Sequence, residues 1–95
     1  MSQLTTRARG DLADIVVYLD GAQVPAARQR GVLERIRKGF AYIDAYPDAA
    51  PVHPDFPGVR YHPVLPYVIY YLDGTNPPQV TRVLHGSADP TFVAG

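Results

Sequence analysis

The sequence predicts a small α+β domain in which a helical hairpin is followed by a meander of three antiparallel strands. In the first half, apolar residues recur with helical spacing at positions 12–19 and 33–43. In the second half, three runs rich in valine, isoleucine and tyrosine are separated by short connections that contain proline or glycine. A chain of 95 residues supports one hydrophobic core, so a single domain over residues 1–95 is expected.

The first helix is expected to be capped at Thr5 or Thr6 and to run to about Asp20. A threonine side chain can accept a hydrogen bond from the free N–H groups of a helix start, and Gly21 offers a natural end. The apolar residues at helical spacing are Leu12, Ile15, Val16 and Leu19. Asp11 lies early in this helix, where a carboxylate interacts favourably with the positive end of the helix dipole.

The second helix is expected to start at Pro25 and to extend to Tyr46, just before Pro47. Its apolar residues alternate in steps of three and four, at Leu33, Ile36, Phe40 and Ile43. Only residues 21–24 connect the two helices, so the helices should lie antiparallel.

A proline-rich loop at 47–57 precedes three expected strands at 58–62, 66–72 and 79–85. Short connections between strands favour antiparallel pairing. The middle strand places Val68, Tyr70 and Leu72 on one face and Tyr67, Ile69 and Tyr71 on the other. Because both faces are apolar, one should receive the helices and the other should form a shallow surface or dock another chain. Residues 89–95 are expected to form a loosely held tail.

The composition excludes several classes of site. Nine basic and nine acidic residues balance, so no overall field favours DNA, RNA or an anionic membrane. Cysteine is absent, which excludes disulfides and thiolate sites. Neither a metal nor a cofactor is expected, since the sequence lacks a glycine-rich phosphate loop, a nucleophile motif and a helical histidine pair. The charged N-terminal segment is unlike a signal peptide or a membrane span, and the cytoplasm is the expected location.

The most concentrated polar feature is Arg60 together with Arg82 and His85 on the expected strands. Two arginines and a histidine could hold a phosphate and transfer protons at an RNA backbone. Alternatively, Arg82 pairs with an acid such as Asp89, and His85 caps the strand end.

The second helix is basic, with Arg28, Arg30, Arg35, Arg37 and Lys38 in one segment. These residues could contact nucleic acid or an acidic protein, or they could form an ordinary solvated face. The sequence shows no aromatic residues interleaved with them, which weakens the nucleic-acid interpretation.

Three segments carry a resemblance to a known family: DLADIVVYL, GVRYHPVLPYVIYYL and RVLHGSADP. Together they resemble the ParE branch of the ParE/RelE superfamily of type II toxin–antitoxin toxins, over about Leu4 to Asp89. The resemblance implies a short N-terminal strand, which can only lie at Ser2–Thr5, before the helical hairpin and the meander.

The resemblance further implies a toxin that inhibits DNA gyrase by binding it and that a cognate, ParD-like antitoxin keeps inactive. Arg60, Arg82 and His85 would then bind the target, and operator DNA would be reached only through the antitoxin. The antitoxin is expected to contact Val17, Tyr18 and Tyr71.

Two alternatives stay open. RelE-like relatives cleave mRNA on the ribosome, and Arg60, Arg82 and His85 would be the catalytic residues of such an endoribonuclease. The segment before Gly58 lacks the lysine of these relatives, and the tail offers Phe92 in place of a tyrosine or histidine. The other alternative is a degenerate, non-toxic module that only binds its antitoxin; many ParE relatives carry more basic residues at the positions of Ser87 and Ala88.

Overall fold

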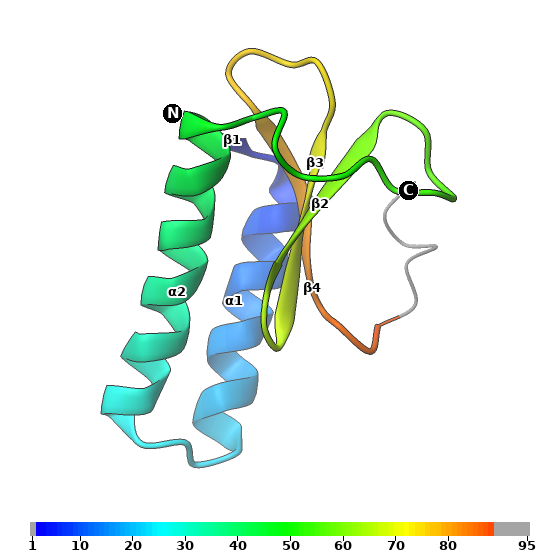
Figure 1. The fold of residues 1–95 in the computed structure, drawn as a ribbon. Coiled ribbons are helices and arrows are strands. Elements are labelled where there is room, and N and C mark those ends of the chain that lie inside the picture. Colours follow the sequence, from blue (N-terminus) through cyan, green and yellow to red (C-terminus); the bar gives the residue numbers. More distant parts are fainter. Residues whose placement is uncertain (1, 89–95) are drawn as a thin grey trace.

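The structure, a computed structural model, describes residues 2–88. Two helices lie side by side on one face of a four-stranded sheet (Figure 1). The elements in chain order are β1 (Gln3–Leu4), α1 (Thr6–Gly21), α2 (Ala26–Ala45), β2 (Val59–Val64), β3 (Tyr67–Leu72) and β4 (Gln79–His85). The predicted α+β order is confirmed. Asp89 and the tail predicted at 89–95 lie outside the described residues. No helix within residues 2–88 is long and apolar enough to cross a membrane.

The strands are ordered β1-β4-β3-β2 across the sheet. The three long strands form the predicted antiparallel meander, whereas β1 pairs in parallel with β4 through Gln3 opposite Gln79 and Leu4 opposite Val80. The sheet is therefore mixed. Strand β2 also runs further than expected, through Pro63 to Val64, because proline is tolerated on an edge strand.

Thr5 fixes the start of α1 against the last strand. Its hydroxyl oxygen accepts the backbone N–H of Ala8 at 3.2 Å, which makes it the predicted helix cap. The same hydroxyl donates to the carbonyl of Thr81 at 3.0 Å. One side chain thus joins the N-terminus of α1 to β4.

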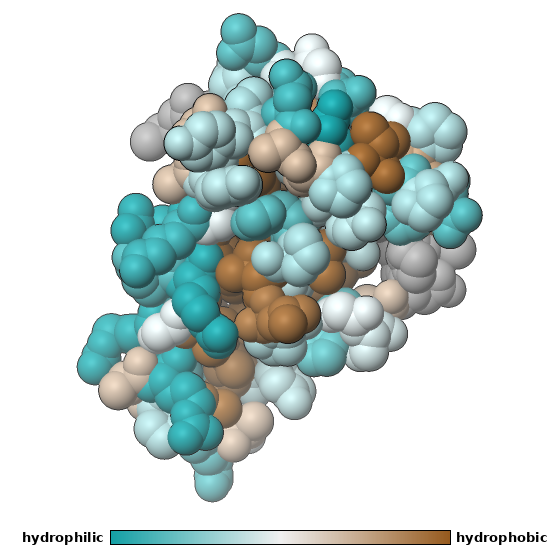
Figure 2. Space-filling model, viewed as in Figure 1, coloured by the Kyte–Doolittle hydropathy of each residue, from teal (hydrophilic) through white to brown (hydrophobic). Residues whose placement is uncertain are grey.

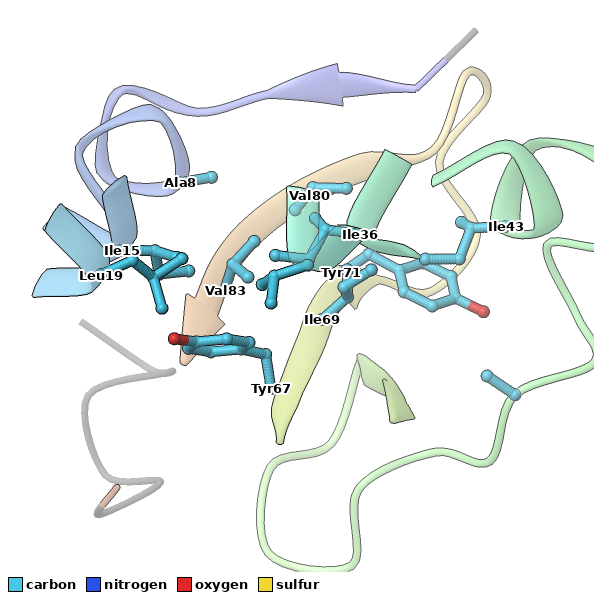
Figure 3. Packing of buried hydrophobic residues seen from close by; sticks show 12 residues of the cluster. Ala8, Ile15, Leu19, Ile36, Ile43, Tyr67, Ile69, Tyr71, Val80 and Val83 are labelled. Carbon is cyan, nitrogen blue, oxygen red and sulfur yellow. The ribbon is translucent and has the colours of Figure 1, made fainter. Parts of the chain in front are cut away.

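The main core lies between the helices and the sheet, where side chains from α1, α2, β3 and β4 converge (Figure 3). Tyr67, Ile69 and Tyr71 of β3 all point into it, as their alternation predicted. Tyr71 is only 1% exposed, and its hydroxyl donates to the Pro47 carbonyl at 2.9 Å. An antitoxin contact at Tyr71 does not fit this position, since the face that carries Tyr71 is the one the helices cover.

The opposite face of the sheet carries a second, smaller cluster around Val59 and Tyr70. The proline-rich loop supplies part of its cover, because the His53 ring lies 5.5 Å from that of Tyr61 and 6.2 Å from that of Tyr70, between ring centroids. Phe56 from the same loop packs on the cluster as well. The second apolar face is therefore partly filled by the chain itself.

Both edges of the sheet are partly closed by other segments. Beyond β1, the N–H of Val83 on β4 is donated to the Asp11 carboxylate at 2.9 Å. At the other edge, Tyr61 N–H bonds the Pro51 carbonyl and His53 N–H bonds the Val59 carbonyl, at 3.2 and 2.7 Å. These bonds satisfy backbone groups that an edge strand would otherwise expose.

Candidate functional site

A groove of about 490 Å³ runs between α1 and the end of β4. Among the described residues, it is lined by Asp14, Ile15, Tyr18, Tyr67, Val83, His85 and Ser87. Its lining combines apolar and aromatic side chains with the polar side chains of Asp14, His85 and Ser87. Such a surface can receive a side chain or short segment of another protein, with apolar contact and a few polar groups that orient it.

Two aromatic rings in contact with each other line part of the groove. Tyr67 and His85 are cross-strand neighbours whose ring centroids lie 5.7 Å apart in an edge-on arrangement. Burial, with a smaller contribution from Tyr18, raises the pKa of Tyr67, so its phenol stays protonated near neutral pH. His85 Nδ1 accepts the N–H of Ser87 at 3.1 Å, which folds the chain back at the end of β4. This contact resembles the strand-end cap that was one interpretation of His85.

The helix beside the groove exposes large apolar side chains. Val17 and Tyr18 are 70% and 67% exposed, and Val16 beside them is also exposed. Burying such side chains against a partner stabilises a complex by roughly 1.5–3 kcal/mol for each fully buried residue. Val17 and Tyr18, unlike Tyr71, are therefore placed where a second chain can reach them.

Arg82 forms a bidentate ion pair with a residue near the other end of the sequence. Its Nε and Nη2 donate to the two carboxylate oxygens of Asp11, at 2.8 and 2.9 Å. Asp11 is 8% exposed, and it also accepts the Val83 N–H. The hydrogen bond with Asp11 raises the pKa of Arg82 and holds its charge in place. Asp11 thus acts on β4. The expected interaction with the helix dipole is not supported, because α1 starts at Thr6 and its first turn holds no acidic residue.

Arg60 is engaged in a second network at the far end of the sheet. Its Nε donates to Asp73 Oδ1 at 2.7 Å, and its Nη1 donates to the Asp48 carbonyl at 3.1 Å and to the Ala50 carbonyl. The bond with Asp73 is the main cause of the raised pKa of Arg60. Arg60 therefore ties the proline-rich loop to β2 and to the β3 end.

The three residues predicted as one polar site do not come together. Arg60 pairs across the sheet with Tyr71 and Arg82 pairs with Tyr70, and consecutive residues of a strand point to opposite faces. His85 stands at a third place, beside the groove. No shared phosphate site is formed by this set.

The family comparison adds to this geometry. The family model for the ParE toxin of the type II toxin–antitoxin system parDE matches residues 3–90. The chain belongs to the ParE toxin family. A ParE toxin is one half of a toxin–antitoxin pair, so this family membership supports a toxin with an antitoxin as its partner. A search of curated proteins found no match to the chain.

The ParE fold of this chain carries a second surface feature, where α2 meets β2. The ring of Tyr42 stacks on that of His62, with centroids 5.0 Å apart and planes 14° apart, and Tyr46 lies 5.1 Å from Tyr42. A shallow hollow beside them is lined by Arg35, Lys38, Gly39, Tyr42, His62 and Val64. Sequence reasoning missed this cluster because His62 is far from Tyr42 along the chain.

Gly39 makes the close approach of α2 to β2 possible. A Cβ atom at this position would lie 2.7 Å from Ile69 Cδ1 and 3.0 Å from Val64 Cγ2. A side chain at this position would require Ile69, Val64 or the helix itself to shift, which would disturb the packing beside Tyr42 and His62. Burial also lowers the pKa of His62, so its ring is neutral near pH 7.

Proposed function

We propose that this ParE-family toxin acts as a binding protein that inhibits DNA gyrase and that a ParD-like antitoxin neutralises it. The observation that carries the proposal is the engagement of Arg60 and Arg82 in ion pairs within the fold. A ribonuclease would need such arginines directed at a phosphate. Here each guanidinium instead supports a distant segment of the chain, which favours inhibition through protein contact.

The cost of redirecting the arginines supports this choice. Arg82 would have to leave a carboxylate that is nearly buried and that accepts three hydrogen bonds. Breaking such a pair typically costs about 3–5 kcal/mol, which an RNA phosphate would have to offset. Within residues 2–88, His85 lies apart from both arginines and so cannot join them in holding a phosphate.

We further propose that the antitoxin covers the groove between α1 and β4 together with the exposed Val17 and Tyr18. A side chain of the antitoxin would enter the groove above Ile15 and Val83, and Tyr18 would pack along its flank. A stable complex buries on the order of 1,000 Å² or more, so the contact must extend beyond the groove. Operator DNA would be bound by the antitoxin and not by the toxin directly. If gyrase is the target, the toxin acts in the cytoplasm.

The gyrase proposal is tested with the purified full-length chain in two parallel assays. Supercoiling of relaxed plasmid by gyrase should be lost and cleaved DNA should accumulate, and added antitoxin should restore supercoiling. A cell-free translation reaction monitored by primer extension should show no new mRNA ends. Codon-positioned cuts with intact supercoiling would instead establish the ribonuclease, and inactivity in both assays with tight antitoxin binding would establish the degenerate module.

His85 provides a variant that separates the two toxic mechanisms. It is exposed and contributes to neither arginine network, so His85→Gln should fold normally. A ribonuclease that uses His85 for proton transfer would lose about 10²–10⁴-fold in rate. A gyrase inhibitor that only touches its target there would lose far less, and measured gyrase inhibition should stay within about tenfold of the unmodified chain.

The antitoxin surface is tested by calorimetry on alanine variants. Val17→Ala combined with Tyr18→Ala should weaken antitoxin binding by at least about tenfold, since both side chains would lose buried contact area. Val52→Ala serves as a matched control, because Val52 is an exposed valine on the proline-rich loop, away from α1. Equal affinities for the double variant and the control would place the antitoxin elsewhere.

A further inference from the structure

The outward face of α2 combines a line of positive charge with exposed aromatic rings. Arg28, Arg35 and Tyr42 recur at intervals of seven residues, which is about two helical turns, so they share one line along the helix. Lys38 lies beside this line, and Tyr46 continues it at the end of the helix. We call Arg28, Arg35, Lys38, Tyr42, Tyr46 and His62 the cationic-aromatic strip.

The positive charge of this strip is local, because the chain as a whole carries no net charge. Helix α2 holds five basic residues and two acidic ones, Glu34 and Asp44, which gives a net charge of +3, whereas the whole chain has a net charge of zero. Glu34 lies one turn before Lys38, and its negative charge offsets part of the positive potential of Lys38. The hydrogen bonds of Glu34, however, go to Arg37 on another side of the helix. Within residues 2–88, Arg28 and Arg35 take part in no ion pair.

The aromatic end of the strip offers ring surface to solvent. Tyr42 and Tyr46 are 44% and 59% exposed, and the ring of His62 stacks on that of Tyr42. The hollow between α2 and β2 places Arg35 and Lys38 at the margin of these rings. Figure 2 shows this face, with hydrophilic side chains along α2 next to a hydrophobic area at the centre.

We propose that the cationic-aromatic strip binds single-stranded nucleic acid, with phosphates on Arg28, Arg35 and Lys38 and a base stacked on the exposed tyrosine rings. Positive charge that follows a backbone, joined to aromatic rings on which bases stack, is the general arrangement of single-strand binding surfaces. An acidic protein segment would use the charges equally well, but it would draw no particular benefit from two exposed tyrosine rings, one of which stacks on a histidine.

Neutral His62 fits this arrangement, because it supports the ring without adding a charge. The strip lies on α2 and β2, whereas the proposed antitoxin surface lies on α1 and β4. Nucleic-acid binding therefore does not depend on the gyrase proposal, and either could fail without the other. No cleavage of the strand is implied.

The test measures fluorescence anisotropy of a labelled oligothymidylate of about 12 nucleotides, within the usual range of single-strand site sizes. The antitoxin-free full-length chain is titrated at several salt concentrations. Tyr42→Leu should lower the affinity at least about fivefold, the fold-change for the weakest base stacking, without changing the salt dependence. Tyr42→Phe keeps the ring and should bind like the unmodified chain.

Charge is tested separately with two matched variants of the same helix. Arg35→Gln should weaken binding and reduce the slope of log affinity against log salt by about 0.7, the value for one lost phosphate contact. Arg30→Gln removes an equal charge from an exposed position off the strip and should leave both quantities nearly unchanged. Circular dichroism checks that all four variants fold.

Three outcomes would overturn the proposal. One is an affinity for the oligonucleotide that Tyr42→Leu leaves intact. Another is an equal loss on Arg30→Gln and Arg35→Gln, which would indicate diffuse electrostatic attraction. The last is a glutamate-rich peptide of matched charge that binds as tightly as the oligonucleotide, which would identify the strip as a contact for an acidic protein.

Discussion

The ion pair between Asp11 and Arg82 allows a quantitative test of what holds α1 to the sheet. Asp11→Ala removes the acceptor of two guanidinium hydrogen bonds and of the Val83 N–H. Removing one partner of a buried pair costs about 3–5 kcal/mol. Because the Arg82 side chain is still 16% exposed, we expect the lower end of that range, about 3 kcal/mol.

This loss is large for a domain of this size. With about 0.05–0.15 kcal/mol of stability per residue, a 95-residue chain has about 5–14 kcal/mol in total. A loss of about 3 kcal/mol should lower the melting temperature by about 12–24 °C. Asp11→Asn keeps an oxygen for the Val83 N–H and should lose only about 1–2 kcal/mol.

Urea unfolding followed by circular dichroism measures these differences. Glu34→Ala is the control, because it breaks an exposed ion pair with Arg37 on α2 and should cost less than about 1 kcal/mol. If Asp11→Ala and Glu34→Ala destabilised the chain equally, the claim that Asp11 fastens α1 to β4 would be refuted.

Three further perturbations test other contacts. In urea unfolding, the Gly39→Ala variant should be less stable than the Gly31→Ala variant by about 1–3 kcal/mol. The reason is that a Cβ atom at Gly39 meets Ile69, whereas one at Gly31 meets nothing within 4 Å. Equal stabilities of the two variants would contradict the close helix–strand contact. Burial lowers the pKa of His62 below 6.5, so the unfolded chain binds that proton more tightly, and the free energy of unfolding should fall as the pH drops below about 6.5. His62→Gln should make the free energy of unfolding depend less on pH in this range. An unchanged pH dependence would rule His62 out as its source. Tyr71→Phe should cost about 0.5–1.5 kcal/mol by calorimetry, because the hydrogen bond to the proline-rich loop is lost; no loss would mean that this bond contributes nothing.

Local patterns in the sequence were sufficient to predict most of the fold. Thr5 is the predicted cap of the first helix, and the alternation of β3 sorts its side chains correctly between the two faces. The hydrogen bonds at a helix start and the alternation of side chains along a strand depend only on residues close in sequence. Both can therefore be predicted directly from the sequence. The family resemblance implied a short first strand, but its parallel pairing with β4 was not predicted, because it depends on a strand more than 70 residues away.

The candidate site was harder to predict for the same reason. Arg82 and Asp11 are 71 residues apart, and nothing in either local segment indicates that they meet. The predicted grouping of Arg60 with Arg82 failed because the side-chain alternation of neighbouring strands directs them to different surroundings. Tyr71 was assigned to the correct face, but the sequence does not show which face the helices cover.

The partly closed edges of the sheet bear on how the chain behaves when it is produced at high concentration. Asp11 occupies the β4 edge at Val83, and the segment around Pro51 occupies the β2 edge. Within residues 2–88, these contacts leave fewer open backbone groups at the edges with which one sheet could extend into the next. Precipitation during overproduction should therefore come from the exposed side chains of α1 and be suppressed by a bound partner, without the cross-β order of a fibril.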